Sequence, residues 1–260
     1  MPPDVTALAG RLFNAYTEHQ DIERLTLEGD IAEREAYAIQ WALIQRHVTA
    51  GERVVGKKTG LTSVAKQRQM NTTEPLYGYL MDRTIGADGD SISRANFIHP
   101  RVESEILFVM DRPLAGPTVT GQQVIAATRY VLPALEVIDS RFRDFKFTAP
   151  DVVADNASAA YVILGGTATV PAELDLRLVG MAVSKNGELL ATGAGAAILG
   201  HPAGSVAWLV RKMAEMGAGG LEEGDIVLAG ALVEAFAIEP GDFMTAEFDH
   251  LGSVSIRCTA

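Results

Sequence analysis

"HPRVESEILFVM" (residues 99–110) has the composition of a buried β-strand but contains two carboxylates. Side chains alternate between the two faces of an extended chain, so Glu103 and Glu105 lie on one face. Leu107 and Val109 fall on the same face, which ends the alternation of polar and apolar residues. An antiparallel strand with one solvated face would explain the two glutamates without any function. The apolar residues on their face instead favour a core strand that carries buried carboxylates.

The overall composition is that of a globular protein. The chain has 260 residues, 48% of them hydrophobic and 21% charged, which fits one large domain or two small ones. No apolar run is long enough for a membrane span. The net charge of −11 argues against general nucleic-acid binding, because such binding depends on neutralising phosphates. An anionic substrate is still compatible, since a metal ion or a lysine can reverse the local field.

Two features predict the cellular compartment. Residues 1–4 lack the basic start and the apolar stretch of a signal peptide. Cys258 is the single cysteine, which excludes an intramolecular disulfide and every multi-cysteine metal site. We therefore expect a cytoplasmic protein.

The chain divides into two regions of different character near residue 52. Before it, apolar residues recur at helical spacing in two stretches, the second with Asp30 placed as its N-cap. After it, short apolar runs are separated by turn residues. They predict strands at 53–58, 102–110, 131–139, 159–165, 176–184, 189–199, 226–229 and 243–257, the last interrupted at Gly252. We expect an α+β fold, with a helical N-terminal segment (1–52) packed on a mainly antiparallel, β-rich catalytic domain (53–260).

Turn and cap signals refine this prediction. Asn186-Gly187 between two apolar runs is a strong hairpin signal. Thr120 and Gln123 form a capping-box pattern, which predicts a helix through Tyr130. A further helix is expected over residues 204–216.

A third carboxylate, Glu136, lies within "YVLPALEVIDS", a run too apolar for a solvated strand. A buried ionised carboxylate must be neutralised, hydrogen-bonded or bound to a cation. If Glu136 meets Glu103 and Glu105 in the fold, the three oxygen ligands would suit Mg²⁺ or Mn²⁺ and leave positions for a chelating substrate.

Two polar stretches supply further candidates, each with a structural alternative. "VVGKKTGLTS" (54–63) places Lys57 and Lys58 in a strand that runs into a turn. Either lysine could face the site and polarise a substrate, or both could extend along the strand end into solvent. "VADNASAAYV" (153–162) places Ser158 before an apolar strand, where a capped turn explains it equally well.

The order of several motifs resembles one enzyme family. The motifs are "GKKTGLTS", "EPLYGYL", "HPRVESEI", "LPALEVIDSR", "VADNAS", "GAGAAILGHP" and "PGD" (240–242). Together they resemble the hydratase/decarboxylase branch of the fumarylacetoacetate hydrolase superfamily over nearly the whole chain. This branch contains the 2-hydroxypenta-2,4-dienoate hydratases and the 4-oxalocrotonate decarboxylases of aromatic meta-cleavage pathways.

The resemblance implies a fold, a cofactor and a set of site residues. The fold would be a mixed β-roll core bearing a divalent metal, Mg²⁺ (or Mn²⁺). The metal ligands would be Glu103, Glu105 and Glu136, with Lys58 as the catalytic lysine and Thr62, Leu76 and Ser158 at the substrate site.

One position predicts which reaction of the branch occurs. Hydratases of this family typically read Pro-Asp-Phe/Tyr-Gly where this chain has Pro75-Leu76-Tyr77-Gly78. Leu76 cannot position water or transfer a proton, and the decarboxylases have an aliphatic residue there. The resemblance therefore implies metal-dependent decarboxylation of 4-oxalocrotonate to 2-hydroxypenta-2,4-dienoate and CO2. The alternatives are a 2-hydroxypenta-2,4-dienoate hydratase and a non-catalytic partner of a pathway hydratase.

The binding group for the distal carboxylate of the substrate and the assembly state stay open at this point. Lys57, Arg141, Arg143 and Lys146 are unranked candidates for that group. The resemblance suggests a homo-oligomer and a complex with the pathway hydratase.

Overall fold

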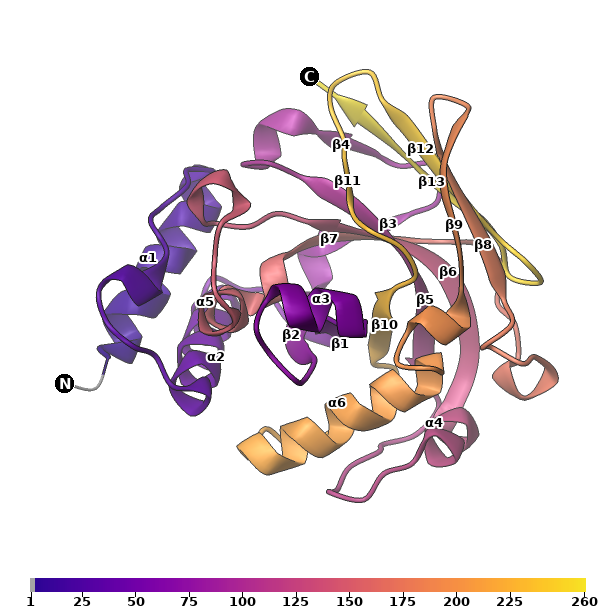
Figure 1. Cartoon of the computed structure of the whole chain (residues 1–260), viewed down its shortest axis with the longest axis horizontal. Helices are drawn as coiled ribbons and strands as arrows, with labels where there is room; N and C mark the ends of the chain where they lie inside the picture. Colours follow the sequence, from indigo (N-terminus) through magenta and orange to yellow (C-terminus); the bar gives the residue numbers. More distant parts are fainter. Residues whose placement is uncertain (1–2) are drawn as a thin grey trace.

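The computed structural model describes residues 3–260, apart from the side chains of Val64 and Gln69. Its main feature is a large curled sheet, which Figure 1 shows wrapping around the middle of the molecule. In spatial order its strands are β2 (Leu76–Met81), β1 (Val54–Gly60), β10 (Ile226–Ala231), β5 (Arg101–Met110), β6 (Thr128–Ile138), β7 (Ala159–Leu164) and β3 (Ile85–Ala87), with β11 (Phe236–Ala237) also pairing with β5. The pairs β1–β10 and β3–β7 are parallel, and the other pairs of this sheet are antiparallel.

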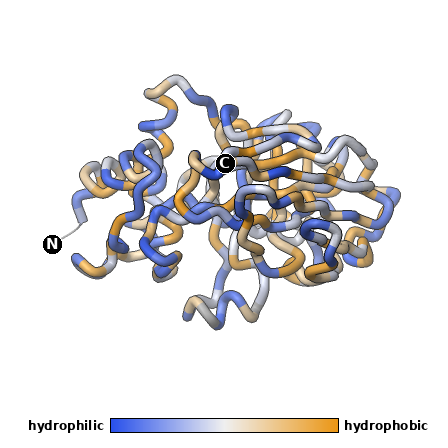
Figure 2. The backbone as a smooth tube through the Cα atoms, turned by 90° about the horizontal axis from the view of Figure 1, so that it is seen from above, coloured by the Kyte–Doolittle hydropathy of each residue, from blue (hydrophilic) through white to orange (hydrophobic). Residues whose placement is uncertain are grey.

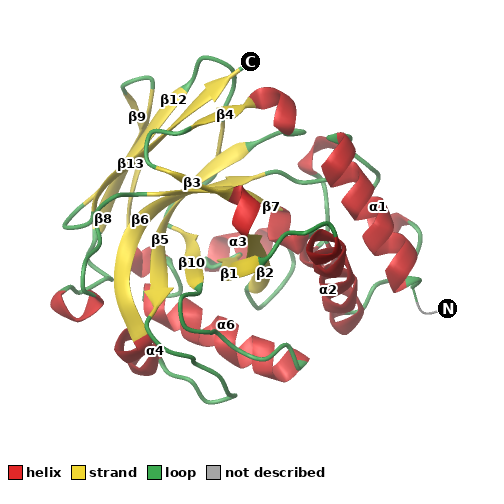
Figure 3. Cartoon of the chain, turned by 180° about the vertical axis from the view of Figure 1, so that it is seen from behind, coloured by secondary structure: helices red, strands yellow, loops and turns green. Residues whose placement is uncertain are grey.

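A second sheet packs against the first, as Figure 3 shows from behind. Its strands, in spatial order, are β4 (Ser91–Ser93), β13 (Gly252–Thr259), β12 (Phe243–Phe248), β8 (Gly180–Lys185) and β9 (Glu188–Ala194). Strands β12 and β13 contact β6, and buried Met244 and Ile256 share a core cluster with Ile106 and Phe108 of β5. Because side chains alternate along β5, this core takes the face opposite to Glu103 and Glu105.

Most helices lie outside the curled sheet, whereas α3 (Val64–Gln69) lies within its curve, in the middle of the molecule (Figure 1). The other helices are α1 (Val5–Glu18), α2 (Glu33–Thr49), α4 (Gly121–Ala127), α5 (Ala149–Ala154) and α6 (Pro202–Met216). Seen from above (Figure 2), α1 and α2 stand at one end of the molecule and most strands at the other. Helix α2 is joined to the sheet by buried Gln40, whose Nε2 donates to the carbonyls of Tyr77 and Val153, both at 2.8 Å. Within residues 3–260, no helix is long and apolar enough to cross a membrane.

The α+β fold class is confirmed, and most strands match their predicted positions. The Asn186-Gly187 hairpin joins β8 to β9, and both of its turn residues have positive φ. The Thr120–Gln123 capping box opens α4 as predicted. The helix expected at 204–216 is α6, which begins slightly earlier, at Pro202.

Several element boundaries were wrong, for local reasons. Asp30 does not cap α2, because Ala32 is the N-cap and its N–H donates to the side chain of Glu35 at 2.8 Å. Helix α4 ends at Ala127, since the residues from Thr128 onward pair with β5 as part of β6. Three strands were drawn too long: residues 176–179 precede β8, residues 195–197 form a 3₁₀ turn after β9, and 243–257, with its expected interruption at Gly252, is a hairpin of two strands, β12 and β13. Strands β2, β3, β4 and β11 and helices α3 and α5 were not predicted.

Candidate metal centre

Three glutamates from two neighbouring strands meet on the concave side of the large sheet. Glu103 of β5 stands directly opposite Glu136 of β6, and Glu105 pairs with Ala134 two residues along. One carboxylate oxygen from each glutamate lies within 4.8 Å of the others, and all three side chains are buried. Like charges placed directly opposite destabilise a strand pair. The fold therefore keeps an arrangement that is unfavourable unless a cation or protons neutralise it.

The electrostatics of the three carboxylates are unequal. Burial and the neighbouring Glu136 raise the pKa of Glu105 well above its usual range. Burial also raises the pKa of Glu136, to about 7, although Lys58 opposes the shift. Burial acts in the same sense on Glu103, but Lys66 and Lys58 outweigh it and lower the pKa of that carboxyl.

Three buried oxygens of this cluster accept no hydrogen bond from the residues that the structure describes. They are Glu105 Oε1 and both oxygens of Glu136, of which Oε2 has only an ion pair with Lys58. Buried carboxylate oxygens without donors are costly, so a bound group is expected to satisfy them. An all-oxygen donor set of three carboxylates suits a hard divalent cation. The residues present therefore fit Mg²⁺ or Mn²⁺.

Lys58 of β1 reaches the cluster from the neighbouring part of the same sheet. Its Nζ lies 2.7 Å from Glu136 Oε2 and donates to the carbonyl of Ala157 at 3.2 Å. Burial would lower the pKa of this lysine, but Glu136, Glu103 and Glu105 reverse the effect and raise it. Lys58 is therefore a fixed ammonium group at the edge of the carboxylate cluster.

The turn that receives Lys58 has an unusual backbone. Asn156, Ala157 and Ser158 are consecutive non-glycine residues with φ of 51°, 54° and 57°. Each such residue costs on the order of 1–2 kcal/mol, so the surroundings must hold the turn in place. The Asn156 side chain does so by accepting from the N–H of Tyr79 at 2.8 Å and donating to its carbonyl at 2.9 Å. The strain presents the Ala157 carbonyl to Lys58 and leaves the buried Ser158 hydroxyl without a partner among the described residues.

Thr62 and Gly230 close another side of the cluster. The N–H of Gly230 donates to Glu105 Oε2 at 2.7 Å. Gly230 has a φ of +113°, and a Cβ there would lie 2.3 Å from Thr62 Oγ1. Glycine is therefore required for this amide to reach Glu105 beneath the buried Thr62 side chain.

Leu76 begins β2 on the face of the sheet that also carries Lys58. It pairs with Gly60, two residues after Lys58 pairs with Gly78. The Leu76 side chain is buried and covers Gly60, where an added Cβ would meet Leu76 Cδ1 at 2.8 Å. Leu80, Leu107, Leu132, Val162 and Leu228 form an apolar cluster on the same face. The carboxylates are therefore bordered on their own face of the sheet by apolar side chains.

One residue at the cluster escaped the sequence prediction. Lys66 of α3 places its Nζ 2.7 Å from Glu103 Oε1. It lies in "VAKQRQ", a polar helical stretch typical of a solvated surface, so its spacing gave no signal.

The four cations proposed for the distal carboxylate lie elsewhere. Lys57 points to the opposite face of β1 and pairs with Asp225 at 2.5 Å. Buried Arg141 pairs with Asp155, while Arg143 and Lys146 pair with acidic residues at the exposed surface. Their charges are already matched away from the three glutamates.

Comparison with known proteins identifies relatives along almost the whole chain. Residues 47–258 match the family model described as fumarylacetoacetate (FAA) hydrolase C-terminal. A 4-oxalocrotonate decarboxylase from Pseudomonas sp. (strain CF600) is 44% identical over 254 residues, covering 97% of this chain and 96% of the relative. A 2-keto-4-pentenoate hydratase from Paraburkholderia xenovorans (strain LB400) is also 44% identical, over 85% of this chain and 81% of the relative.

The fold has an equally similar counterpart among solved structures. The 4-oxalocrotonate decarboxylase from Pseudomonas putida G7, complexed with magnesium and adipate, superposes with a TM-score of 0.95 at 42% identity. The superposition covers 98% of this chain and 97% of that one. Together with the family match, this confirms the resemblance predicted from the motifs. The chain belongs to the fumarylacetoacetate hydrolase C-terminal family.

Proposed function

We propose that the protein decarboxylates 4-oxalocrotonate (2-oxohex-3-enedioate) to 2-hydroxypenta-2,4-dienoate and CO2, with Mg²⁺ (or Mn²⁺) as cofactor. One observation carries the proposal: three buried carboxylates with unpartnered oxygens lie beside apolar side chains and a buried lysine. Relatives with this activity are similar over 97% of the chain, which supports the choice of substrate. The enzyme is thus a carbon–carbon lyase acting on a small 2-oxo dicarboxylate.

Glu103, Glu105 and Glu136 would hold the metal. When bound, the ion supplies Lewis-acid stabilisation of negative charge on the 2-oxo group of the substrate. The Gly230 amide fixes Glu105, while Lys58 fixes Glu136. These contacts orient the ligands before the cation arrives, as partners around a metal site usually do.

The bond changes of the reaction explain the position of Lys58. Cleavage of the C5–C6 bond releases CO2, and its electron pair passes through the C3–C4 double bond to the C2 oxygen. Lys58 Nζ lies at the carboxylate cluster and stays charged, so it donates a hydrogen bond to that oxygen as negative charge develops. The oxygen then takes up one proton from solvent, which gives 2-hydroxypenta-2,4-dienoate. The Ser158 hydroxyl, next to the Ala157 carbonyl, is placed to bind the same substrate.

Leu76 favours decarboxylation over hydration. Hydration needs a polar group to position water and transfer a proton, and a buried leucine offers neither. The apolar cluster that includes Leu107, Leu132 and Leu228 excludes water from the face where the reaction occurs. A 2-hydroxypenta-2,4-dienoate hydratase is the second candidate function, because hydratases are as similar in identity as decarboxylases.

A direct assay distinguishes the two functions. The Mg²⁺-loaded protein is expected to release CO2 from 4-oxalocrotonate at the same rate as the ultraviolet absorbance of the dienol product rises. Loss of the dienol absorbance without CO2 would show the hydratase reaction instead. A protein that turns over neither compound would support a non-catalytic role beside a hydratase.

Leu76→Asp tests the position that separates the two reactions. A carboxylate at this buried position would make the surroundings of the leaving carboxylate polar and would hold water there. The rate of CO2 release should therefore fall at least about tenfold. Leu178→Asp is the matched control, because Leu178 is 73% exposed. Equal loss in both variants would show that Leu76 has no special role.

Assembly and location complete the proposal. We place the enzyme in the cytoplasm as a homo-oligomer that associates with the pathway hydratase, which would take over the dienol product. Light scattering of the purified protein, alone and mixed with such a hydratase, tests both associations. Cell fractionation tests the location.

A further inference from the structure

Lys66 is the one cation of the cluster that is carried by a short helix rather than by the sheet. Helix α3 is anchored at its start by Ser63, whose hydroxyl accepts from the Lys66 N–H at 3.2 Å. Gln67 Nε2 donates to the Leu61 carbonyl at 2.9 Å. The backbone of Lys66 is therefore held beside the cluster, while its long side chain reaches Glu103.

The side chains of Lys58 and Lys66 differ in how firmly the protein holds them. The Lys58 side chain is 3% exposed and is held by both Glu136 and the Ala157 carbonyl. The Lys66 side chain is 30% exposed, and Glu103 is its one acceptor among the described residues. A flexible four-carbon stem lets an ammonium group change partners. Lys66 can exchange its acceptor, whereas Lys58 is fixed.

A bound metal would change the charge balance around Lys66. Without metal, the two ammonium groups of Lys58 and Lys66 face three carboxylates. A divalent ion would take up the charge of Glu103, which weakens its attraction for Lys66. The site would then hold surplus positive charge, which suits an anionic substrate.

We infer that Lys66 binds the C1 carboxylate of the 2-oxo acid, exchanging it for Glu103 when metal and substrate bind. This inference rests on the proposed function. The 2.7 Å contact with a metal-ligand oxygen places the ammonium group at the metal-proximal end of the substrate. A chelating 2-oxo acid leaves one carboxylate oxygen free at that end. A lysine on the distal carboxylate would stabilise the very charge that must be lost as neutral CO2, and so would slow the reaction.

Lys66→Gln tests the exchange by two binding measurements at pH 8. Titration calorimetry with Mg²⁺ alone should show binding about threefold tighter or more, because a competing cation is removed from Glu103. Titration of the Mg²⁺-loaded variant with pyruvate, a minimal 2-oxo acid, should show binding at least about tenfold weaker. Lys66→Arg keeps the charge and should restore pyruvate affinity to within about threefold. Lys146→Gln, an exposed lysine on Asp144, is the matched control and should match the wild type.

The two opposite shifts are the signature of the inference. Loss of both affinities in Lys66→Gln would show that Lys66 only supports Glu103, and unchanged pyruvate affinity would exclude carboxylate binding. Either result overturns the inference. Thermal unfolding of each metal-free variant checks that the fold is intact.

The inference and the proposed function fail separately. If the wild type releases no CO2 while both shifts are found, the proposed function is wrong and the carboxylate role stands. If CO2 is released and Lys66→Gln leaves both KM and pyruvate affinity unchanged, the inference is wrong and the proposed function stands.

Discussion

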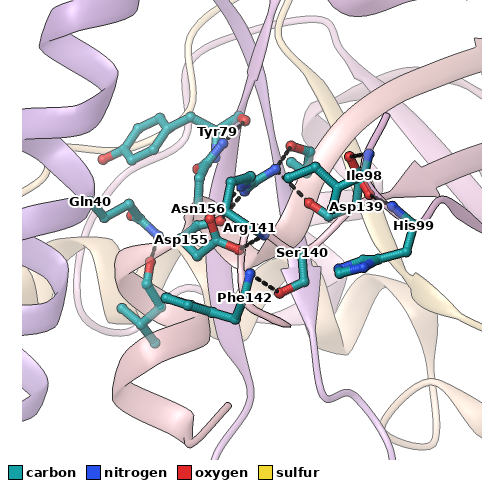
Figure 4. A network of polar contacts seen from close by, with 12 residues as sticks. Gln40, Tyr79, Ile98, His99, Asp139, Ser140, Arg141, Phe142, Asp155 and Asn156 are labelled. Atoms are coloured by element: carbon teal, nitrogen blue, oxygen red, sulfur yellow. Dashed lines mark hydrogen bonds and ion pairs between the residues drawn. The ribbon is translucent and has the colours of Figure 1, made fainter. Parts of the chain in front are cut away.

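Two buried clusters of charged side chains in this protein differ in how completely their charges are paired. Arg141 pairs with the Asp155 carboxylate and also donates to the carbonyls of Asp139 and Asp155. Asp139 in turn accepts from the N–H groups of Ile98 at 2.8 Å and His99 at 2.7 Å. Figure 4 shows how these contacts link the segments before β5 and after β6 to the end of α5. Its carboxylates and its guanidinium are fully occupied by protein partners.

The glutamate cluster is incomplete by comparison. Its three carboxylates outnumber its two lysines, and Glu105 Oε1 and Glu136 Oε1 lack donors among the described residues. Both clusters are buried, so burial alone does not mark a functional site. The difference lies in whether the charged groups have partners within the chain. The Arg141 network is complete, or closed, and supports the fold, whereas the glutamate cluster is open and is arranged for a cation that the chain itself does not supply.

The largest expected effect comes from breaking the open cluster. Glu105→Gln keeps an acceptor for Gly230 but removes one anionic ligand, so turnover should fall by on the order of a thousandfold. The stability of the metal-free protein should not fall, because burial and the nearby Glu136 already disfavour the charged form of Glu105 and raise its pKa. CO2 release and chemical denaturation measure the two effects. Glu247→Gln, on an exposed position of β12, is the control. Equal loss of stability and activity would contradict this reading.

Breaking the closed cluster should act on the fold instead. Arg141→Met leaves Asp155 buried and unpaired, which is expected to cost about 3–5 kcal/mol of unfolding free energy. Adding Asp155→Leu removes the unpaired charge and should recover part of that loss. Urea denaturation of the single and double variants measures both steps. A single variant as stable as the wild type would show that the pair contributes little.

The pH dependence of metal binding tests the protons held by the open cluster. The pKa of Glu136 is raised to about 7 and that of Glu105 is raised as well, so lowering the pH adds protons that a metal must displace. Mg²⁺ affinity should therefore fall about tenfold or more between pH 8 and pH 6. Calorimetry in buffers of different ionisation enthalpy counts the released protons, and Glu105→Gln should release fewer. A pH-independent affinity would mean that the carboxylates are ionised before the metal binds.

The smallest expected effect concerns the strained turn between the two clusters. Ala157 has a φ of 54°, a conformation that glycine adopts without strain, so Ala157→Gly should stabilise the fold by up to about 1 kcal/mol. Turnover should decrease a few-fold if the looser turn holds Lys58 less firmly. Thermal unfolding and kcat measure these opposite changes. A less stable variant would show that the packing of the Ala157 methyl group contributes more to stability than the strained backbone costs.

The sequence predicted those parts of the site whose signals are local. Glu103, Glu105 and Glu136 stood out because apolar residues surround them in the chain, and Leu76 because it replaces the aspartate typical of related hydratases. The opposition of Glu103 and Glu136 could not be predicted, since strand register depends on distant residues. Lys66 was missed because a lysine in a polar helix reads as solvated until its partner is known.

The same distinction applies to the fold. Strands with long apolar runs, such as β5 and β6, were predicted well. Short strands such as β3 and β4 were missed because few residues carry their pattern. The left-handed turn at 156–158 contains no glycine, so its conformation is imposed by tertiary contacts rather than by local propensity.

The turn at 156–158 also covers one edge of the large sheet. Strand β2 is the outermost strand at one end, and its outer backbone groups would otherwise be free to pair with another chain. The Asn156 amide takes both polar groups of Tyr79, while Gln40 of α2 takes the Tyr77 carbonyl. Two side-chain amides thus stand in for the missing neighbouring strand. The turn that receives Lys58 thereby also covers a sheet edge at which another chain could otherwise pair.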